Sequence, residues 1–285
     1  MSPTTIPPLP DIVIEPLVRL ALTEDLGRAG DITSWATIPA EAEMSATVNA
    51  REPGIAAGYD AARLATRLID PEIKWHVLHP EGVPFEKGAE LLRMHGSARS
   101  ILTAERTVLN FIGPMSGVAT LTSRFVAKTA GTGARIVCTR KTRPGFRALE
   151  KRAVRLGGGV NHRFGLDDAI LIKDNHIAAA GGIEAVMTRA KAARPHLCAI
   201  EIEVDTLDQL AEALPFGPDV VLLDNMKPDT LREAVAMIKG ACLAEASGGV
   251  NLDTVAAIAA TGVDYISVGA ITHSAINLDV GLDYG

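Results

Sequence analysis

The sequence predicts an α/β protein, with an α+β region at its N-terminus and a β/α barrel or wound parallel sheet in its C-terminal half. Two observations carry this prediction. From about residue 135 onward, short apolar runs typical of strands alternate with amphipathic helix patterns, whereas the earlier part shows no regular alternation. With 285 residues, 47% of them hydrophobic, the chain is long enough for one barrel-sized domain and a smaller one.

The N-terminal region is expected to mix helices and strands. The segment 15–26, EPLVRLALTEDL, has helical apolar spacing, with Pro16 tolerated in the first turn, and GRAGDITS ends it. A further helix is expected over 59–69, and strands are expected around 46–50, 73–78 and 89–94.

Two more helices are expected before the regular alternation begins. Ser100 can cap a helix that runs through Ile112, and Gly113-Pro114 separates it from a helix that ends near Ala130. We therefore expect the domain boundary near these helices.

The C-terminal half repeats the order strand, turn, helix. Thr206 and Gln209 fit a capping box at the start of one of its helices. The expected strands are 135–139, 169–173, 198–204, 219–224, 241–246 and 264–268, and the expected helices are 145–156, 183–193, 206–214, 228–239 and 252–260. Because parallel neighbours require crossover connections, this order predicts a parallel sheet covered by helices.

Positive charge is concentrated between residues 135 and 173. This stretch holds ten Lys or Arg against three acids, a local charge of +7 in a chain whose net charge is −6. Two strand-like runs in it, RIVCT and AILIK, lead into cationic residues, and ligands bind at the C-terminal ends of strands in barrels and open α/β sheets. The pattern predicts a pocket for a polyanionic ligand.

Composition argues against several other classes of protein. The acidic balance and the 4% aromatic content disfavour a nucleic-acid partner, which calls for a wide basic surface. No run reaches the roughly 18 apolar residues of a membrane span, and the N-terminus lacks a signal-peptide pattern, so we expect a cytoplasmic protein. Cys138, Cys198 and Cys242 have no metal-binding spacing and are expected to be buried free thiols.

Three acidic residues on strands are candidates for ligand or metal binding. Glu201 and Glu203 alternate onto one face of the run CAIEIEV, and Asp224 closes VVLLD. Carboxylates directed into a barrel are costly unless they bind a cation or a polar ligand, so a structural ion pair with a lysine and a ligand role are both open. Glu203 lies nearer the C-terminal end of its strand and is the better candidate.

Two late turns fit a phosphate site. Ser247-Gly248-Gly249 lies between a strand and a helix, and Gly269-Ala270-Ile271 offers a second such turn. Either turn alone would be interpreted as a plain tight turn. Barrel phosphate sites are often built from the last two strand-to-helix loops, so the two turns together are more specific.

The basic stretch contributes two sets of side chains. The first set follows strands or turns: Arg140, Lys141, His162, Arg163 and Lys173. Arginine and lysine there suit carboxylates and phosphates, while His162 could equally be a hydrogen-bonded structural histidine. The second set falls largely on the helix 145–156, where a solvated face is expected: Arg143, Arg147, Lys151, Arg152 and Arg155.

Long motifs run through most of the chain. They are TRKTRPGFRALEKRAVRLGGGVNHRFGLDDAILIKDNH, preceded by LTAERTVLNFIGPMSGVAT, with LTEDLGRAGDITS near the start and LLDNM, EASGGV and GVDYISVGAITHS later. Together they resemble the quinolinate phosphoribosyltransferases, the decarboxylating nicotinate-nucleotide pyrophosphorylases of NAD biosynthesis. Cys138 stands before TRKT where this family more often has aspartate, and we expect it to alter only packing or a contact behind the site.

The resemblance implies a fold and a reaction. The fold is an N-terminal α/β sandwich domain over 1–115, rejoined by the tail 275–285, plus a C-terminal open β/α barrel over 116–274, paired head to tail in a homodimer. The reaction is phosphoribosyl transfer from phosphoribosyl pyrophosphate to quinolinate with decarboxylation, and it uses Mg2+ and yields nicotinate mononucleotide, pyrophosphate and CO2.

The resemblance also implies roles for residues. Lys141, Lys173, Glu203 and Asp224 are expected to serve the chemistry, and Glu203 and Asp224 to hold the ribose hydroxyls and the magnesium pyrophosphate. The other residues expected around the substrates are Thr139, Arg140, His162, Arg163, Ser247, Gly248, Gly249, Gly269, Ala270, Ile271 and His273. Arg106 of AERT is expected to act in the neighbouring subunit's site.

Three alternative functions stay open at this point. A homologue of the same fold from molybdate-transport operons would be separated by quinolinate-dependent pyrophosphate release. A Schiff-base aldolase acting through Lys173 would be revealed by borohydride trapping. A non-catalytic sensor of phosphorylated ligands could dispense with Glu203 or Asp224, yet both are present.

Overall fold

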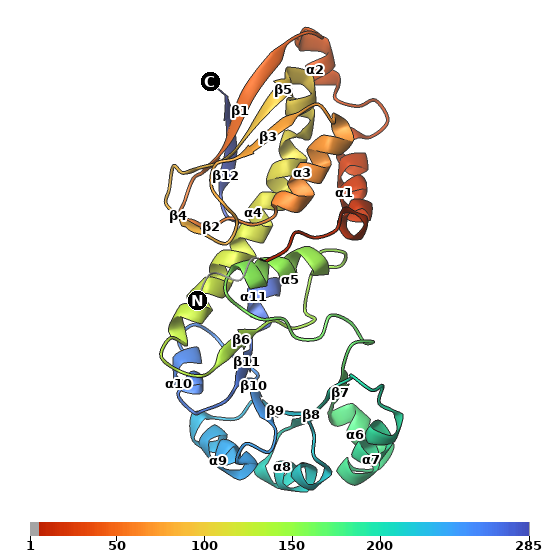
Figure 1. Cartoon of the computed structure of the whole chain (residues 1–285), viewed down its shortest axis with the longest axis vertical. Helices are drawn as coiled ribbons and strands as arrows, with labels where there is room; N and C mark the ends of the chain where they lie inside the picture. Colours follow the sequence, from red (N-terminus) through yellow and green to blue (C-terminus); the bar gives the residue numbers. More distant parts are fainter. Residues whose placement is uncertain (1–5, 285) are drawn as a thin grey trace. The chain divides into compact units, whose positions relative to one another are not determined.

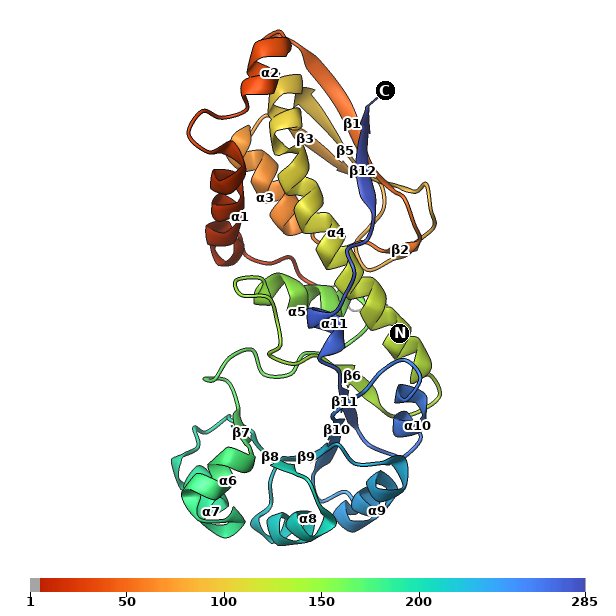
Figure 2. The ribbon, with the colours of Figure 1, turned by 180° about the vertical axis from the view of Figure 1, so that it is seen from behind.

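The computed structural model describes residues 6–284 and divides into two compact units (Figure 1, Figure 2). The first unit contains residues 6–123, 142–158 and 272–284, and the second contains 124–141 and 159–271. Residues 1–5 and 285, which the predicted N-terminal domain and its tail include, lie outside the described residues. The division differs from the predicted ranges 1–115 and 116–274, chiefly because the segment 142–158 belongs to the first unit.

The first unit is built on an antiparallel sheet in the order β12-β1-β5-β3. Burial alternates along β1, with Ala46, Val48 and Ala50 inside, as expected for a strand with one face on the core. The strands are β1 (Glu43–Ala50), β3 (Lys74–Val77), β5 (Glu90–Ser97) and β12 (Val280–Tyr284), and a separate ribbon pairs β2 (Gly54–Ile55) with β4 (Pro84–Phe85).

Helices cover one face of this sheet, as Figure 2 shows. Of the helices, α3 (Tyr59–Ile69) and α4 (Ala98–Lys128) face the strands, while α1 (Asp11–Leu26) packs beside α3 and α2 (Ile32–Thr37) follows α1 in the chain. Apolar side chains of α3 and α4 meet the strands in a core that includes Ala62, Leu92 and Val108. One layer of helices on one sheet confirms the predicted α/β sandwich. None of the helices between residues 6 and 284 has the length and apolar character of a membrane span.

Two predictions about the first helices are wrong in detail. Helix α1 begins at Asp11, so Pro16 lies in its second turn, where it removes one backbone hydrogen bond. Helix α2 was not predicted, although the side chain of Asp31 accepts a hydrogen bond from the backbone N–H of Ser34 at 3.0 Å and caps its first turn.

The predicted break at Gly113-Pro114 is also wrong, because α4 is one continuous helix of 31 residues. Its two glycines serve the chain tail instead. The backbone N–H of Leu278 donates to the carbonyl of Gly113 at 3.1 Å. A Cβ atom at Gly117 would lie 2.0 Å from the carbonyl oxygen of Ile276, so only glycine permits this approach of two backbones.

The second unit is a six-stranded parallel sheet in the order β6-β11-β10-β9-β8-β7. The strands are β6 (Arg135–Val137), β7 (Ile170–Ile172), β8 (Ile200–Val204), β9 (Val220–Asp224), β10 (Leu243–Ser247) and β11 (Tyr265–Ser267). All six predicted strands are confirmed. Since β6 and β7 end the order without pairing with each other, the barrel is open, as the resemblance implied.

Helices connect these strands and lie on the outer side of the curved sheet (Figure 1). They are α6 (Asp174–Ala180), α7 (Ile183–Ala193), α8 (Leu207–Ala213), α9 (Pro228–Ile238) and α10 (Val255–Ala259). The short α11 (Ala270–His273) follows the last strand at its C-terminal end and does not belong to this outer layer. Half of the predicted capping box of α8 is confirmed, because the side chain of the N-cap residue Thr206 accepts from the backbone N–H of Gln209. The Gln209 side chain accepts from the backbone N–H of Asp205, one residue before the N-cap, so the reciprocal bond of a strict box is not formed.

Helix α5 (Arg147–Leu156) corrects the expectation of a solvated basic face. Lys151 is only 3% exposed. The guanidinium group of Arg152 lies 3.0 Å from a carboxylate oxygen of Asp60 and 2.7 Å from one of Glu81, and all three side chains are nearly buried. Arg152 therefore joins α5 to other parts of the first unit, and Lys151 is withdrawn from solvent, whereas Arg155 is exposed as predicted.

Gly117→Ala tests the tight contact between α4 and the tail. Alanine inside a helix is ordinarily more favourable than glycine by about 1 kcal/mol. Here the added Cβ meets a backbone carbonyl, so we expect the free energy of unfolding in urea to fall by roughly 1–3 kcal/mol. Asn110→Ala, at an exposed position of the same helix, is the control and should change it by less than about 0.5 kcal/mol. Equal stability of Gly117→Ala and the wild type would contradict this account.

Candidate active site at the C-terminal edge of the parallel sheet

The predicted site residues of the second unit gather at one edge of the parallel sheet. Because all six strands run in one direction, their C-terminal ends meet there. Arg140 and Lys141 follow β6, and Lys173 follows β7 directly. Glu203 lies one residue before the end of β8, and Asp224 is the last residue of β9.

A short bridge beside β6 brings His162 and Arg163 to the same edge. Val160 pairs in parallel with Val137, and its backbone N–H donates to the carbonyl of Ile136 at 2.8 Å. The backbone N–H of Cys138 in turn donates to the carbonyl of Val160 at 3.2 Å. The segment after the GGG turn therefore runs along β6 as an added strand would.

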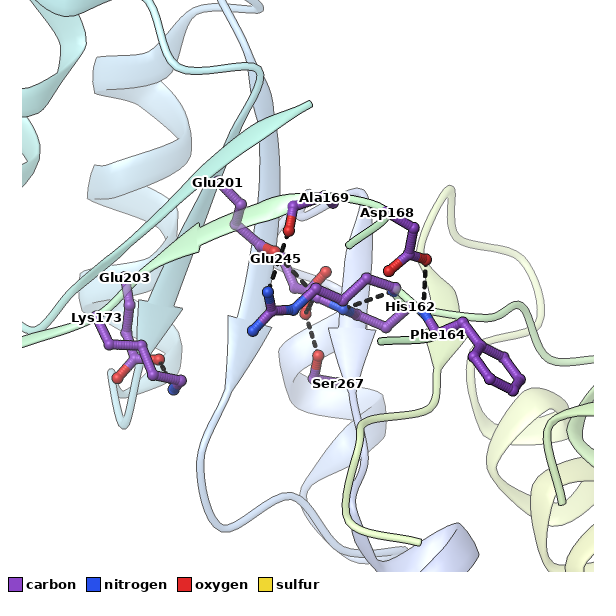
Figure 3. Close-up of polar contacts among 10 residues, drawn as sticks. His162, Phe164, Asp168, Ala169, Lys173, Glu201, Glu203, Glu245 and Ser267 are labelled. Atoms are coloured by element: carbon purple, nitrogen blue, oxygen red, sulfur yellow. Dashed lines mark hydrogen bonds and ion pairs between the residues drawn. The ribbon is translucent and has the colours of Figure 1, made fainter. Parts of the chain in front are cut away.

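His162 lies in a buried cluster with two glutamates and a serine (Figure 3). Its Nε2 is 2.8 Å from a carboxylate oxygen of Glu201, on β8, and 3.8 Å from one of Glu245, on β10. Ser267, on β11, donates a hydrogen bond to Glu245. Of the two expectations for His162, this arrangement favours a hydrogen-bonded structural histidine.

Glu245 holds its proton at unusually high pH. Burial raises the pKa of its carboxyl to about 7, and the neighbouring charge of Glu201 adds to the rise. His162 and the hydrogen bond from Ser267 act in the opposite direction but are weaker. Two carboxyl groups in one buried cluster cannot both be charged at little cost, so the second keeps its proton.

Arg163 is held in place between opposing charges. Its guanidinium donates to the carbonyl of Ala169 at 3.1 Å, and its Nε is buried without a hydrogen-bond partner among the described residues. Burial lowers the pKa of Arg163, the charge of Arg140 lowers it further, and Glu201 and Asp168 raise it. The guanidinium groups of Arg140 and Arg163 are close enough to affect each other, and the Nε–H of Arg163 has no acceptor among the described residues. Such a pair suits an anionic ligand.

Lys173 and Glu203 form an ion pair at the ends of β7 and β8 (Figure 3). This is the lysine partner that one interpretation of the strand carboxylates predicted. Lys173 remains 45% exposed at its side chain and Glu203 is 14% exposed, so the pair borders the open edge of the sheet.

Asp224 is linked to the glycine turn of the next strand through Asn225. Asn225 has a positive φ of 54°, its side chain donates to Asp224 at 2.5 Å, and its backbone N–H donates to the carbonyl of Ser247 at 2.9 Å. Gly248 has φ +91°, and a Cβ there would lie 2.1 Å from the side-chain oxygen of Asn225. The first predicted phosphate turn therefore requires glycine for packing as well as for its backbone.

The remaining predicted residues lie in varied places. Thr139 accepts a hydrogen bond from the backbone N–H of Lys141 at 3.0 Å and so shapes the turn after β6. Gly269 precedes the four-residue helix α11, which holds Ala270 and Ile271 and ends at the exposed His273. Arg106 is exposed on α4 in the first unit.

Two groups of acids could hold a cation. Glu203 and Asp224 offer hard carboxylate oxygens at adjacent strand ends, which fits Mg2+, a metal usually bound by one or two carboxylates together with substrate phosphates. The other group is His162, Glu201 and Glu245, whose ligand atoms lie within 4.8 Å of one another.

Sequence reasoning missed Glu245 and Asn225 and ranked Glu201 below Glu203. Glu245 stands in the middle of the buried strand LAEAS, and an acid inside an apolar strand run was the available signal. Asn225 follows a strand end in LLDNM, and no spacing pattern marks its left-handed backbone.

Fold and site together define an α/β protein with a sandwich unit and an open β/α barrel, whose barrel edge carries facing cations and carboxylates. Comparison with known protein families specifies the class further. The model for the quinolinate phosphoribosyl transferase N-terminal domain matches residues 31–116, and that for the C-terminal domain matches 118–283. The chain belongs to the quinolinate phosphoribosyltransferase family, which confirms the resemblance in its motifs.

Individual relatives agree with this assignment. The chain is 46% identical over 271 residues to the carboxylating nicotinate-nucleotide pyrophosphorylase of Mycobacterium leprae, covering 93% of this chain and 95% of that protein. It is 42% identical over 270 residues to a probable enzyme of the same name from Bacillus subtilis, covering 95% and 93%. The solved nicotinate-nucleotide pyrophosphorylase of Francisella tularensis superposes with a TM-score of 0.93 at 40% identity, covering 99% of each chain.

Glu245→Gln tests the protonation of the buried cluster. Glu245 binds its proton more tightly in the folded chain, with a pKa of about 7, than at its ordinary value of 4.5. Its contribution to stability is therefore full below about pH 4.5 and is lost as the pH rises to about 7. We expect the free energy of unfolding of Glu245→Gln, relative to wild type, to rise between about pH 5 and about pH 8 in urea titrations. Glu233→Gln, at an exposed position of α9, is the control, and a pH-independent difference for Glu245→Gln would contradict the prediction.

Proposed function

We propose that this chain transfers a phosphoribosyl group from phosphoribosyl pyrophosphate to quinolinate and releases pyrophosphate and CO2, forming nicotinate mononucleotide for NAD biosynthesis. One observation carries the proposal beyond family membership. The cationic residues and the Glu203 and Asp224 carboxylates, which come from segments far apart in the sequence, meet at one edge of the sheet. This arrangement suits two anionic reactants, one of which also bears hydroxyl groups.

Electrostatics explains why the site needs so many cations. Quinolinate carries two carboxylates and the ribosyl donor carries several phosphate charges, so the two repel each other in a pocket of low dielectric constant. Arg140, Lys141 and Arg163 offset this repulsion and orient the reactants. The pyridine nitrogen then attacks the anomeric carbon as pyrophosphate leaves, and positioning and charge stabilisation promote the step without a protein nucleophile.

The remaining roles follow from the same chemistry. Glu203 and Asp224 would bind the ribose hydroxyls and hold Mg2+, which would neutralise charge on the pyrophosphate when bound. Lys173 would move from Glu203 toward an anionic group of the substrates. Once the ring nitrogen is quaternary, its positive charge stabilises the electron pair that stays on the adjacent ring carbon when the carbon–carboxylate bond breaks and CO2 departs, and that carbon then takes a proton from water. The backbone N–H groups of the turns at Gly248-Gly249 and Gly269-Ala270 would bind the ribose phosphate.

The proposal includes a cytoplasmic homodimer in which Arg106 completes the neighbouring subunit's site. Arg106 is exposed on α4. An exposed arginine on a long helix can reach a partner's substrate, and it would add a further cation for quinolinate.

The direct test measures nicotinate mononucleotide formed from quinolinate and phosphoribosyl pyrophosphate, with nicotinate in place of quinolinate as the control substrate. We expect product only from quinolinate. Lys141→Ala and Arg106→Ala should each lower kcat at least about 100-fold, the usual loss when a charge-stabilising contact is removed. The matched controls are Lys191→Ala on the barrel exterior and Arg124→Ala on α4. Near-normal turnover in Lys141→Ala and Arg106→Ala would refute the site assignment.

Mixing subunits tests the action of Arg106 across a dimer. Arg106→Ala and Lys173→Ala subunits are each expected to be inactive, and a mixed dimer would contain one site free of both substitutions. We therefore expect partial recovery of nicotinate mononucleotide formation after subunit exchange. If exchange is verified by mass spectrometry and no activity returns, Arg106 serves the site of its own subunit.

A further inference from the structure

Two buried carboxyl groups lie beside the cationic residues and have no part in the proposed reaction. Glu201 and Glu245 are 6% and 4% exposed, and both approach the Nε2 of His162 (Figure 3). Burying acids at this depth is costly unless they are hydrogen-bonded or paired with charge. Their retention inside the barrel calls for a physical reason.

The hydrogen bonds of His162 define its tautomer. The backbone N–H of Arg163 donates to Nδ1 at 2.8 Å, so Nδ1 carries the lone pair. The ring proton is therefore on Nε2 and is donated to the carboxylate of Glu201 at 2.8 Å. Because both ring nitrogens are engaged within the chain, the imidazole joins Glu201 to the backbone of Arg163.

Glu201 also acts on Arg163 through its charge. Arg140 and Arg163 carry like charges close enough to affect each other, and Glu201 opposes that effect. One carboxylate oxygen of Glu201 is bound to His162, and the other is buried without a hydrogen-bond partner among the described residues. Hydrogen bonds therefore compensate the negative charge of Glu201 only in part. This charge acts on the guanidinium group of Arg163.

We propose that Glu201 is a positioning residue for a substrate with two adjacent ring carboxylates. Through His162 it fixes the backbone of Arg163, and its charge offsets the repulsion between the guanidinium groups of Arg163 and Arg140. Both guanidinium groups are then already in their binding positions before the dianion binds. The inference rests on the proposed function, because it assigns these two arginines to quinolinate.

Glu245 completes the cluster without adding a second charge. Burial and the charge of Glu201 keep its proton in place up to about pH 7, so the region keeps one counter-charge against two guanidinium groups. A second carboxylate would cancel the positive field that a dianion needs. A metal ion held by His162, Glu201 and Glu245 is disfavoured because the charge of Arg163 lies beside them.

The test measures binding of phthalate, a benzene ring with two adjacent carboxylates, to the full chain by titration calorimetry. We expect Glu201→Gln to weaken phthalate binding at least about tenfold, and Glu245→Gln and the exposed control Glu233→Gln to stay within about threefold of wild type. In the same variants, binding of phosphoribosyl pyrophosphate alone should change less than about threefold.

Kinetics gives a second readout that a purely structural role would not produce. For Glu201→Gln the KM for quinolinate should rise at least about tenfold, while kcat at saturating quinolinate stays within about threefold. If Glu201→Gln is recovered unfolded, Glu201→Asp takes its place. It keeps the charge but withdraws it from Nε2 by one methylene, and should weaken phthalate binding at least about threefold.

Several outcomes would overturn the inference. The first is that the folded Glu201 variant binds phthalate as tightly as the wild type does. The second is that Glu201→Gln and Glu245→Gln lose phthalate affinity to the same extent. The third is that the wild type binds one Zn2+ and Glu245→Gln does not. Phthalate binding requires no turnover, so the two proposals can fail separately. A wild type that binds phthalate but forms no nicotinate mononucleotide would defeat the proposed function alone, and one that binds neither phthalate nor quinolinate would defeat both.

Discussion

The common direction of the six barrel strands is the constraint on which the site depends. Parallel pairing places the C-terminal end of every strand at the same edge of the sheet, and the helical crossovers occupy the outer side. Lys173, Glu203 and Asp224 belong to three successive strands or their ends, and the pairing of β7, β8 and β9 makes them neighbours. If one of these strands ran in the opposite direction, its charged residue would lie at the far edge of the barrel.

The second constraint is that the charges at the site must balance. The chain meets it with cations at the open edge of the sheet and with acidic residues behind and beside them. Cations face the open edge of the sheet, where two anionic reactants would otherwise repel each other. Glu201 and His162 lie behind them and keep like charges together, while Glu203 pairs with Lys173 nearer the solvent. Glu203 is thus paired with a lysine, Glu245 keeps its proton up to about pH 7, and the charge of Glu201 acts on the guanidinium group of Arg163. This explains how a chain with a net charge of −6 maintains a locally positive site.

Much of this architecture was predictable from local pattern. Alternating apolar runs indicated all six barrel strands, and the predicted limits of α3 and α7 agree with the structure to the residue. Strand periodicity also placed Glu201 and Glu203 on one face. These inferences succeed because side-chain periodicity and turn residues depend on neighbours a few positions away. The long motifs added the family, which the comparisons confirm.

Contacts between distant segments were decided only by the tertiary structure. Helix α4 continues through Pro114 because packing outweighs one lost hydrogen bond, a balance that no local signal records. Lys151 is buried, although its helix was expected to present a solvated basic face. Glu201 forms a hydrogen bond with His162, which lies 39 residues earlier in the chain. The proton on Glu245 depends on burial and on a neighbouring charge from another strand. Sequence pattern specifies which side chains face inward, whereas the fold determines which of them meet and which of them are ionised.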